Sequence, residues 1–170
     1  MNDKNRIQYL LNEHLSYGLT TNDIVESLLK NYIVLVYIKN NEIIGLITAS
    51  QCRKDYFNIE LPSFKKDSYM INHFVVDTPY RQQGIGEELM DNYLNNKTIY
   101  SVGWVKSDTN KWDARNLAKK YGFKEIAYVK NYFGLKEPVY CPICSGDCLC
   151  DGIIIEKQGD VRDEKIKRIK

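Results

Sequence analysis

Two stretches of this sequence have residue types and spacings that suit binding chemistry: a glycine loop and a cysteine cluster. The glycine loop, Arg81-Gln82-Gln83-Gly84-Ile85-Gly86, follows an apolar segment, Tyr69–Val76, and precedes apolar residues at helical spacing. The start of a helix has four backbone N–H groups without partners and roughly half a positive charge, so it attracts phosphate. Glycines at 84 and 86 would let a phosphate approach the backbone closely. We therefore expect a phosphate site here, with Arg81 as an added cation.

The spacing of this loop, R-x-x-G-x-G, differs from the dinucleotide fingerprint and from the Walker loop. The run V-D-T-P-Y-R-Q-Q-G-I-G, followed by an amphipathic helix, resembles the acyl-CoA-binding motif of the GNAT N-acetyltransferase family, [RQ]-x-x-G-x-[GA]. The alternative interpretation is a strand–helix turn that holds glycine for geometry alone.

The resemblance implies transfer of an acetyl group from acetyl-CoA, the co-substrate, to a primary amine of a small molecule or protein by direct attack. It also implies that Phe74, Val75 and Val76 lie beside the pantetheine arm, with a strand N–H on the thioester oxygen. Plain core packing of these three side chains is compatible with that role, because only their backbone takes part. The pyrophosphate would be wrapped by the backbone of Gln82, Gln83, Gly84, Ile85, Gly86 and Glu87.

The proton acceptor and donor of such a reaction are less easily assigned. An alkyl amine has a pKa near 10.4 and must lose a proton before it attacks. Many relatives carry a Glu four residues before the end of the strand, where this sequence has Asn72, which cannot act as a base. His73 is the candidate base, although adjacent strand residues point to opposite faces and a structural histidine is the alternative.

The family's proton donor is a tyrosine in the pattern L-Y-x-x-x-G-F. The matching segment here, Leu117 to Phe123, has Ala118 at that position. Tyr121 lies nearly one helical turn further on and is the candidate acid. The alternative is that it packs on the core.

The cysteine cluster consists of Cys141, Cys144, Cys148 and Cys150, with the spacing C-x2-C-x3-C-x-C. Such a set suits a tetrahedral zinc site, although the gap between the last two is tighter than usual. Disulfides and free or redox-active thiols are the alternatives. In the resembled family the hairpin between the last two strands borders the acceptor pocket, so the resemblance implies that a bound metal fixes a loop that shapes the amine site. Four protein thiolates would leave the metal no open position for catalysis. Cys52 stands alone and is expected to be buried.

The elements that must position these residues follow from periodicity and turn signals. Gln51–Ser68 is expected to be mainly loop, and the segment after the glycine loop to be a helix carrying Leu89, Met90, Tyr93 and Leu94. Their order resembles the GNAT fold from about Ile24 to Lys157: α/β (α+β), with a mixed, mostly antiparallel sheet whose central strands splay, flanked by helices. Further helices are expected over Asn5–Ser16, after Thr20 or Thr21 and over Trp112–Tyr121, and strands over Ile33–Ile38, Glu42–Ser50, Tyr69–Val76, Thr98–Val105, Phe123–Phe133 and Gly152–Lys157.

Composition sets limits on the class of protein. A chain of 170 residues with 44% hydrophobic content suits one domain, 1–170, with a cysteine-rich insertion at 141–150 between the last two strands. A net charge of +2 gives no argument for nucleic acid or a membrane. Because the sequence lacks a long apolar run and a signal-peptide core, we expect a cytoplasmic protein with reduced cysteines. Dimers are frequent in the resembled family, so a homodimer is one expectation.

Two other functional readings stay open. The missing Glu and Tyr favour a non-catalytic acyl-CoA-binding or zinc-sensing module on the same fold. Nucleic-acid binding through the cysteine segment is disfavoured, because that segment has Asp147 and Asp151 and lacks Lys and Arg. The acceptor amine is not specified, although aromatic residues would suit an apolar or cationic one. The candidates for lining its pocket, each with core packing as the alternative, are Tyr9, Tyr17, Trp104, Trp112, Tyr132 and Phe133.

Overall fold

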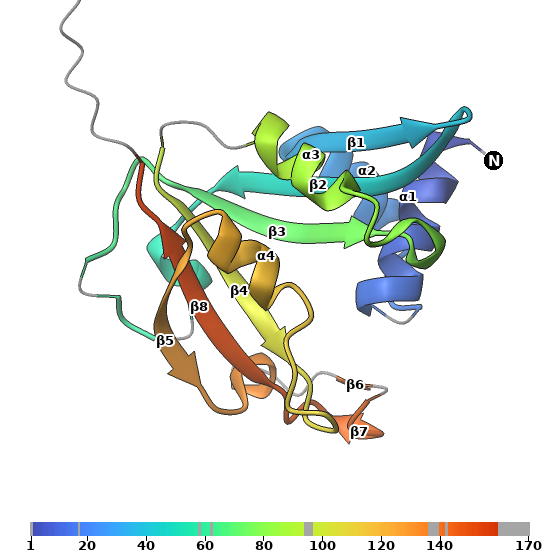
Figure 1. Ribbon diagram of the computed structural model, residues 1–170. Helices are drawn as coiled ribbons and strands as arrows, with labels where there is room; N and C mark the ends of the chain where they lie inside the picture. The colour runs from blue at the N-terminus through green and yellow to red at the C-terminus, as the bar shows by residue number, and fades with distance from the viewer. Residues whose placement is uncertain are drawn as a thin grey trace, which may run out of the picture.

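The chain folds around a mixed six-stranded sheet with the strand order β1-β2-β3-β4-β8-β5 (Figure 1). The computed structural model describes residues 2–16, 18–57, 59–61, 63–93, 97–135, 140–141 and 143–159. All neighbouring strands run antiparallel except β3 and β4. The bounds are β1 Ile33–Lys39, β2 Glu42–Gln51, β3 Tyr69–Val76, β4 Ile99–Val105, β5 Lys124–Val129 and β8 Asp151–Lys157, with α1 Asp3–Leu11, α2 Asn22–Asn31, α3 Ile85–Tyr93 and α4 Arg115–Lys120.

Helices cover both faces of the sheet, and β2 contributes side chains to the core on each face. Leu46 is fully buried in a cluster with residues of α1 and α2, whereas its neighbour Ile47 is buried in the cluster with α3 and α4. Alternate residues of a strand point to opposite faces, so a nearly continuous apolar strand suits a central position. The mixed, mostly antiparallel sheet flanked by helices was predicted and is confirmed.

The hairpin between β1 and β2 turns at Asn40 and Asn41, as the sequence predicts. Both residues have positive φ, 52° and 60°. This is the conformation that a two-residue hairpin turn requires, and asparagine tolerates it better than other residues with a Cβ.

The two central strands separate halfway along their length. The parallel pairing of β3 with β4 covers only Tyr69↔Ile99 to Ile71↔Ser101. Beyond that point β3 pairs with β2 alone and β4 with β8 alone, so the strands diverge (Figure 1). The predicted splay of the central strands is confirmed, and it leaves one edge of β3 without a neighbouring strand.

Three elements are shorter than their sequence patterns predict. The first helix is α-helical only to Leu11 and continues as a π-helical turn over Asn12–Ser16, where the Ser16 hydroxyl donates to the Leu11 carbonyl. The helix predicted from Trp112 begins at Arg115, because Trp112 is packed over Gly103 of β4. Strand β5 ends at Val129, since Asn131 adopts positive φ.

The cysteine segment holds a small hairpin that the sequence analysis did not anticipate. Strands β6 (Tyr140–Cys141) and β7 (Gly146–Asp147) form a separate two-stranded sheet. The predicted loop over 51–68 contains a short 3-10 turn, Lys54–Tyr56. Leu94, expected in the third helix, lies outside the described residues. None of the helices in the described part of the chain has the length and apolar run needed to cross a bilayer.

The central position of β8 gives a stability prediction. Ile154 is 0% exposed, whereas Ile38 on the edge strand β1 is 58% exposed. We expect Ile154→Ala to lower the free energy of unfolding by about 2–5 kcal/mol, because it leaves a cavity between packed layers. Ile38→Ala is the matched control and should change it by less than about 1 kcal/mol. Urea unfolding followed by circular dichroism measures both, and equal effects would contradict the core assignment.

Candidate active site

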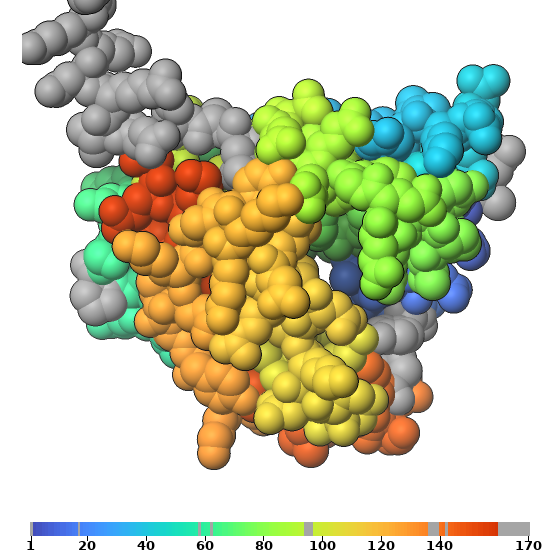
Figure 2. Space-filling view, in the orientation of Figure 1, coloured from blue at the N-terminus to red at the C-terminus, as the bar shows by residue number. Residues whose placement is uncertain are grey.

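A cleft of about 600 Å³ opens where β3 and β4 separate. Its walls come from the β3 edge, from the glycine loop and from the segment that joins β4 to α4. Figure 2 shows the surface hollowed between the light-green region around α3 and the yellow region that follows β4. The cleft thus lies at the point in the sheet where backbone groups have lost their neighbouring strand.

The glycine loop, which borders this cleft at Gln82, Gly84 and Gly86, contains a row of unpaired amides. The first bond of α3 is donated by Glu88 N–H to the Gly84 carbonyl, at 3.0 Å. Among the described residues, the backbone N–H groups from Gln82 to Glu87 have no hydrogen-bond acceptor. The loop is shaped by left-handed residues, with φ of 60° at Gln82 and 82° at Gly84. Six adjacent donors at a helix start can bind an anion of more than one phosphate.

The two glycines of the loop serve different purposes. A Cβ on Gly84 would meet nothing within 4 Å, so glycine is needed there for its positive φ. A Cβ on Gly86 would come within 3.2 Å of Phe74 Cζ, so glycine is needed there because the helix start packs closely on β3. The loop is therefore held against the strand that forms the cleft.

The exposed edge of β3 offers further donors. Asp77 N–H donates to the Ile44 carbonyl on the β2 side, whereas the Val76 carbonyl accepts from Arg81 Nε at 2.9 Å on the other side. Because backbone direction alternates along a strand, the N–H groups of Phe74 and Val76 face the cleft. A carbonyl oxygen or an amide of an extended ligand can pair with them. The side chain of Val75 instead packs with α1 and α2.

A β-bulge changes the orientation of His73. In the pairing of β2 with β3, Thr48 lies opposite His73 and Ala49 lies opposite Ile71, so Asn72 is an extra residue. Thr48 and Ser50 are two residues apart and therefore share a face of β2. Thr48 Oγ1 is 2.7 Å from His73 Nδ1. Ser50 Oγ donates to Asn72 Oδ1. The bulge therefore turns two adjacent side chains to one face. His73 lines the cleft, contrary to the simple alternation considered for an unbroken strand.

His73 is held as a neutral imidazole. Burial lowers its pKa below the ordinary value of 6.5. Nδ1 contacts the fully buried Thr48, whereas Nε2 has no hydrogen-bond partner among the described residues. A neutral ring with one nitrogen anchored and the other facing a cavity can exchange a proton with a bound ligand.

A buried polar network, which the sequence analysis missed, supports the glycine loop from behind. Arg6 donates to Asp77 Oδ2 at 2.6 Å, and Asp77 Oδ1 accepts from His14 Nε2 at 3.1 Å. His14 Nδ1 in turn accepts from the Arg81 guanidinium at 3.2 Å. Because a carboxylate only accepts and a guanidinium only donates, His14 donates from Nε2 and accepts at Nδ1 in this network. Arg81 is thus oriented by the π-helical turn after α1, Asn12–Ser16, as well as by its own loop.

Asp77 is the anion of this network. Burial raises its pKa, but the hydrogen bonds from His14 and Arg6 and the charge of Arg6 outweigh burial, so the pKa is lowered from the ordinary value of 3.8. Arg6 belongs to α1, and His14 to the π-helical turn that follows it. Their convergence on a turn more than sixty residues away is set by tertiary packing.

Tyr121 does not line the cleft. Its hydroxyl is directed to α3, where it donates to Asp91 Oδ1 at 2.8 Å and contacts the Glu87 carbonyl at 2.9 Å. Burial and the hydrogen bond to Asp91 raise the pKa of Tyr121 to about 12. The residue joins α4 to α3, and this geometry favours the packing alternative over proton donation.

A second cavity of about 370 Å³ continues from the first. Both are lined by Leu15, Asn72, His73, Val102 and Trp104. Trp112 lines the first cavity and Phe133 the second. Tyr132 is buried against Gly152, and Tyr9 is 41% exposed beneath Arg6; Tyr17 lies outside the described residues. Of the six aromatic candidates, Trp104, Trp112 and Phe133 therefore reach the cavities.

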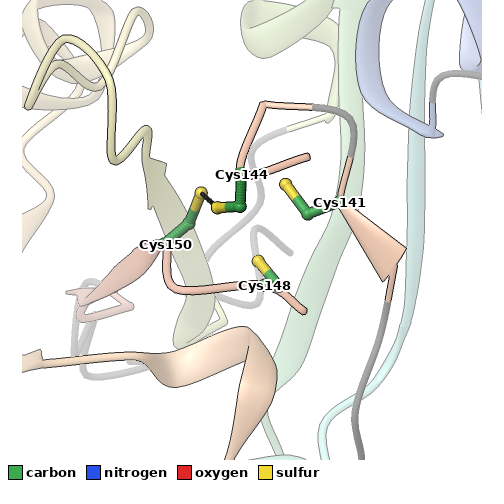
Figure 3. A group of neighbouring side chains, drawn as sticks. All are labelled: Cys141, Cys144, Cys148 and Cys150. Atoms are coloured by element: carbon green, nitrogen blue, oxygen red, sulfur yellow. Dashed lines mark hydrogen bonds between the residues drawn. The ribbon is translucent and has the colours of Figure 1, made fainter. Parts of the chain in front are cut away.

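The four cysteines of the cluster converge on one point (Figure 3). Their sulfur atoms all lie within 4.8 Å of one another, and all four are free thiols. Hydrogen bonds from Ser107 and from the Leu149 amide lower the pKa of Cys144 to about 7, whereas burial raises the pKa of Cys148 to about 12. Cys52 is buried in a different cluster, as expected.

Comparison with known proteins places the chain in a family. The model of the acetyltransferase (GNAT) domain matches residues 30–125, more than half of the 170 residues. The protein therefore belongs to the GNAT acetyltransferase family, which uses acetyl-CoA. No curated protein is similar enough in sequence to be matched.

Solved structures of low sequence identity share the fold. The ribosomal-protein-S18-alanine N-acetyltransferase from Escherichia coli has a TM-score of 0.66 and 15% identity, over 96% of this chain and 92% of that chain. An N-acetyltransferase from Staphylococcus aureus has a TM-score of 0.65 and 17% identity, over 92% of each chain. A GNAT family acetyltransferase from Elizabethkingia anophelis with acetyl-CoA bound has a TM-score of 0.57 and 20% identity, over 88% of each chain.

The network behind the glycine loop gives a prediction about stability and pH. We expect Asp77→Asn to lower the free energy of unfolding by about 3 kcal/mol at neutral pH, because it removes the buried anion of the Arg6 guanidinium and leaves only the half-exposed Glu42 carboxylate, 3.1 Å from Arg6 Nε. The lowered pKa of Asp77 means that its contribution is present above pH 3.8 and is lost as pH falls through the folded value. The variant should therefore lose less stability than wild type as pH falls below about 3.8 and through the folded pKa of Asp77.

Urea unfolding at a series of pH values measures this difference. Asp55→Asn is the matched control, because Asp55 pairs with Arg53 at the exposed surface, where an ion pair contributes about 0–1 kcal/mol. Parallel pH profiles for Asp77→Asn and wild type would contradict the assignment.

Proposed function

We propose that this protein transfers the acetyl group of acetyl-CoA to a primary amine of a small molecule or protein by direct attack, in the cytoplasm. The observation that supports the proposal most strongly is the row of six unpaired amides, Gln82–Glu87, at the end of an unpaired strand edge. A ligand with a pyrophosphate at one end and an extended amide chain at the other would satisfy both sets of donors.

Binding of the co-substrate would use the backbone more than side chains. The loop amides and Arg81 would bind the pyrophosphate, and the edge of β3 at Phe74, Val75 and Val76 would lie along the pantetheine arm. The amine nitrogen would attack the thioester carbonyl carbon, and a β3 N–H would stabilise the oxygen as it becomes negative. The C–S bond would then break, and the thiolate would leave with the electron pair. It would take up the remaining extra proton of the nitrogen, so that the products are the amide and the CoA thiol.

His73 is the residue best placed to accept the proton from the attacking amine. In this role Nδ1–H would donate to Thr48, leaving the lone pair of Nε2 directed to the cavity. With a pKa below 6.5, His73 would take a proton from an alkyl ammonium at a cost of at least about 5 kcal/mol. For a peptide α-amine, with a pKa of about 7.7–8.0, the minimum cost falls to about 2 kcal/mol. The weak base thus favours a weakly basic acceptor.

The second cavity supports the same choice. Among its described lining residues there is no Asp, Glu, Lys or Arg, so no carboxylate there would form an ion pair with a strongly cationic amine. Its apolar wall includes Leu15, Trp104 and Phe133. We therefore propose a peptide α-amine as the acceptor. The similar structure from Escherichia coli is an alanine N-acetyltransferase, which supports the proposal only through a shared fold.

A non-catalytic acyl-CoA-binding module is the second candidate. It is favoured by Ala118 at the family's tyrosine position and by the orientation of the Tyr121 hydroxyl to α3. The two candidates differ in one observable: only an enzyme releases free CoA thiol from acetyl-CoA in the presence of an amine.

The glycine loop is tested by calorimetric titration of acetyl-CoA. We expect Gly84→Asp to weaken binding by at least about ten-fold, because a carboxylate would repel the pyrophosphate at the amide row. Gly18→Asp is the matched control, since Gly18 also has positive φ (91°) and open space around its Cα, but lies away from the loop. Binding by both variants as by wild type would contradict the phosphate site.

The acceptor and the base are tested by thiol release. Two peptides are compared: one has a free N-terminus and no lysine, so its only amine is the α-amine, and the other has an acetylated N-terminus and one lysine, so its only amine is the lysine side chain. We expect the first peptide to give a kcat/KM at least about ten-fold above that of the second. Initial rates should fit a sequential mechanism, and no thiol should be released in a burst without amine.

His73→Ala should lower kcat by about 10²–10⁴ without changing the Kd of acetyl-CoA. Above pH 6.5 the rate of wild type should follow ionisation of the amine, because His73 is already neutral there. A preference for lysine, or an unchanged kcat in the variant, would remove the assigned base.

A further inference from the structure

Four cysteine thiols have no part in the acyl transfer, yet they lie together beside the cavities. The sulfur atoms of Cys144 and Cys150 are 3.7 Å apart, and all four lie within 4.8 Å of one another. A tetrahedral zinc ion with Zn–S bonds of about 2.3 Å has sulfur–sulfur edges of about 3.8 Å. A disulfide needs about 2.05 Å, so the separation of the sulfurs matches a shared metal better than a covalent bond.

The path of the backbone through the β6–β7 hairpin and into β8 brings the four sulfurs together. Cys141 ends β6 opposite Gly146 of β7, and Cys144 lies in the turn of this hairpin, which is closed by Ser145 with φ of 54°. Cys148 follows β7, and Cys150 directly precedes β8. The tight gap between the last two cysteines is accommodated because the chain there passes from the hairpin into the main sheet.

Hydrogen bonds around the sulfurs suit thiolate ligands. The Leu149 N–H donates to Cys144 Sγ at 3.3 Å. Ser107, from the segment between β4 and α4, places its Oγ 3.2 Å from Cys144 Sγ and 3.8 Å from Cys150 Sγ. Such outer contacts orient metal ligands and stabilise their charge. The Ser107 contacts also connect the β6–β7 hairpin to the segment between β4 and α4.

The cluster borders the second cavity and is absent from the first. Cys141 and Cys148 line the second cavity together with Phe133 and Trp104, whose rings meet edge to face with centroids 6.4 Å apart. The first cavity contains the glycine loop but none of the cysteines. His73 lines both cavities, so the cysteine end lies across the proposed proton acceptor from the phosphate end.

We propose that Cys141, Cys144, Cys148 and Cys150 bind one zinc ion, and that the metal-bound hairpin is a wall of the acceptor pocket. With four protein thiolates the metal has no open position, so its role is to fix this wall. Metal occupancy then controls binding of the acceptor and leaves binding of acetyl-CoA unchanged. The metal site stands on its own geometry, whereas its link to the acceptor rests on the proposed function.

The metal site is tested on the full chain purified without chelator. We expect about one zinc per chain by mass spectrometry of the metal, and exchange for cobalt should give the visible and near-ultraviolet bands of a tetrahedral tetrathiolate. Cys144→Ala should lose the metal. Cys52→Ala is the matched control and should keep it, because Cys52 lies in another cluster. Metal-free protein, or two disulfides found by mass spectrometry without reduction, would overturn the site.

The link to the acceptor is tested by comparing zinc-loaded wild type with wild type from which zinc has been removed. We expect removal to raise the KM of the free-N-terminus peptide by at least about ten-fold, through displacement of the pocket wall. The Kd of acetyl-CoA should stay within about two-fold, because the glycine loop borders the other cavity. Amide hydrogen exchange should increase in the β6–β7 hairpin and stay unchanged in the loop 82–87.

These readouts separate failure of the two proposals. The link to the acceptor would be overturned if zinc is present but its removal leaves the peptide KM unchanged. It would also be overturned if zinc removal weakens acetyl-CoA binding as much as it raises the peptide KM. A third result is that zinc is bound and hydrogen exchange changes as expected, but no peptide causes thiol release. This result would overturn the proposed acceptor and leave the metal site in place.

Discussion

The early end of pairing between β3 and β4 is the constraint on which the rest of this structure depends. Backbone donors and acceptors cannot be left dry without a cost of about 1–3 kcal/mol each, so an unpaired strand edge must meet solvent or a ligand. Here β3 loses its neighbour after Ile71, and the bulge at Asn72 turns the strand at the same point. The cleft, its free amides and the access to His73 all follow from this divergence.

The glycine loop is held in place by contacts on two sides. On one side, Gly86 lets the start of α3 pack on Phe74. On the other, Arg81 is tied through His14 and Asp77 to Arg6 of α1. A network of alternating donors and acceptors has one arrangement that satisfies every member, so it holds the loop in one position before a ligand arrives. Such preorganisation lowers the entropy lost on binding.

The two cavities differ in what surrounds them. The first borders the glycine loop and the second borders the cysteine cluster, and His73 and Trp104 line both. An acyl donor in the first cavity and an amine in the second would therefore both reach His73, beside the other residues that line both cavities. The outer wall of the second cavity is a hairpin of two very short strands, which has little apolar core of its own. Small elements of this kind usually need a crosslink or a metal to hold their shape.

The sequence by itself determined the features that depend on local spacing. These include the strand–loop–helix from Tyr69 to Tyr93, the hairpin at Asn40-Asn41, the order of elements, and the cysteine set with its tetrahedral ligand count. Local chemistry decides them, because turn dihedrals, helix starts and ligand spacing involve residues close in the chain. The pattern also extended α4 and β5 too far, since Trp112 and Asn131 are used for packing and turning. Only the tertiary structure decided that the bulge directs His73 into the cleft, that Tyr121 bonds to α3, and that His14 supports Arg81. Those outcomes depend on partners from distant segments, whose positions no local pattern encodes.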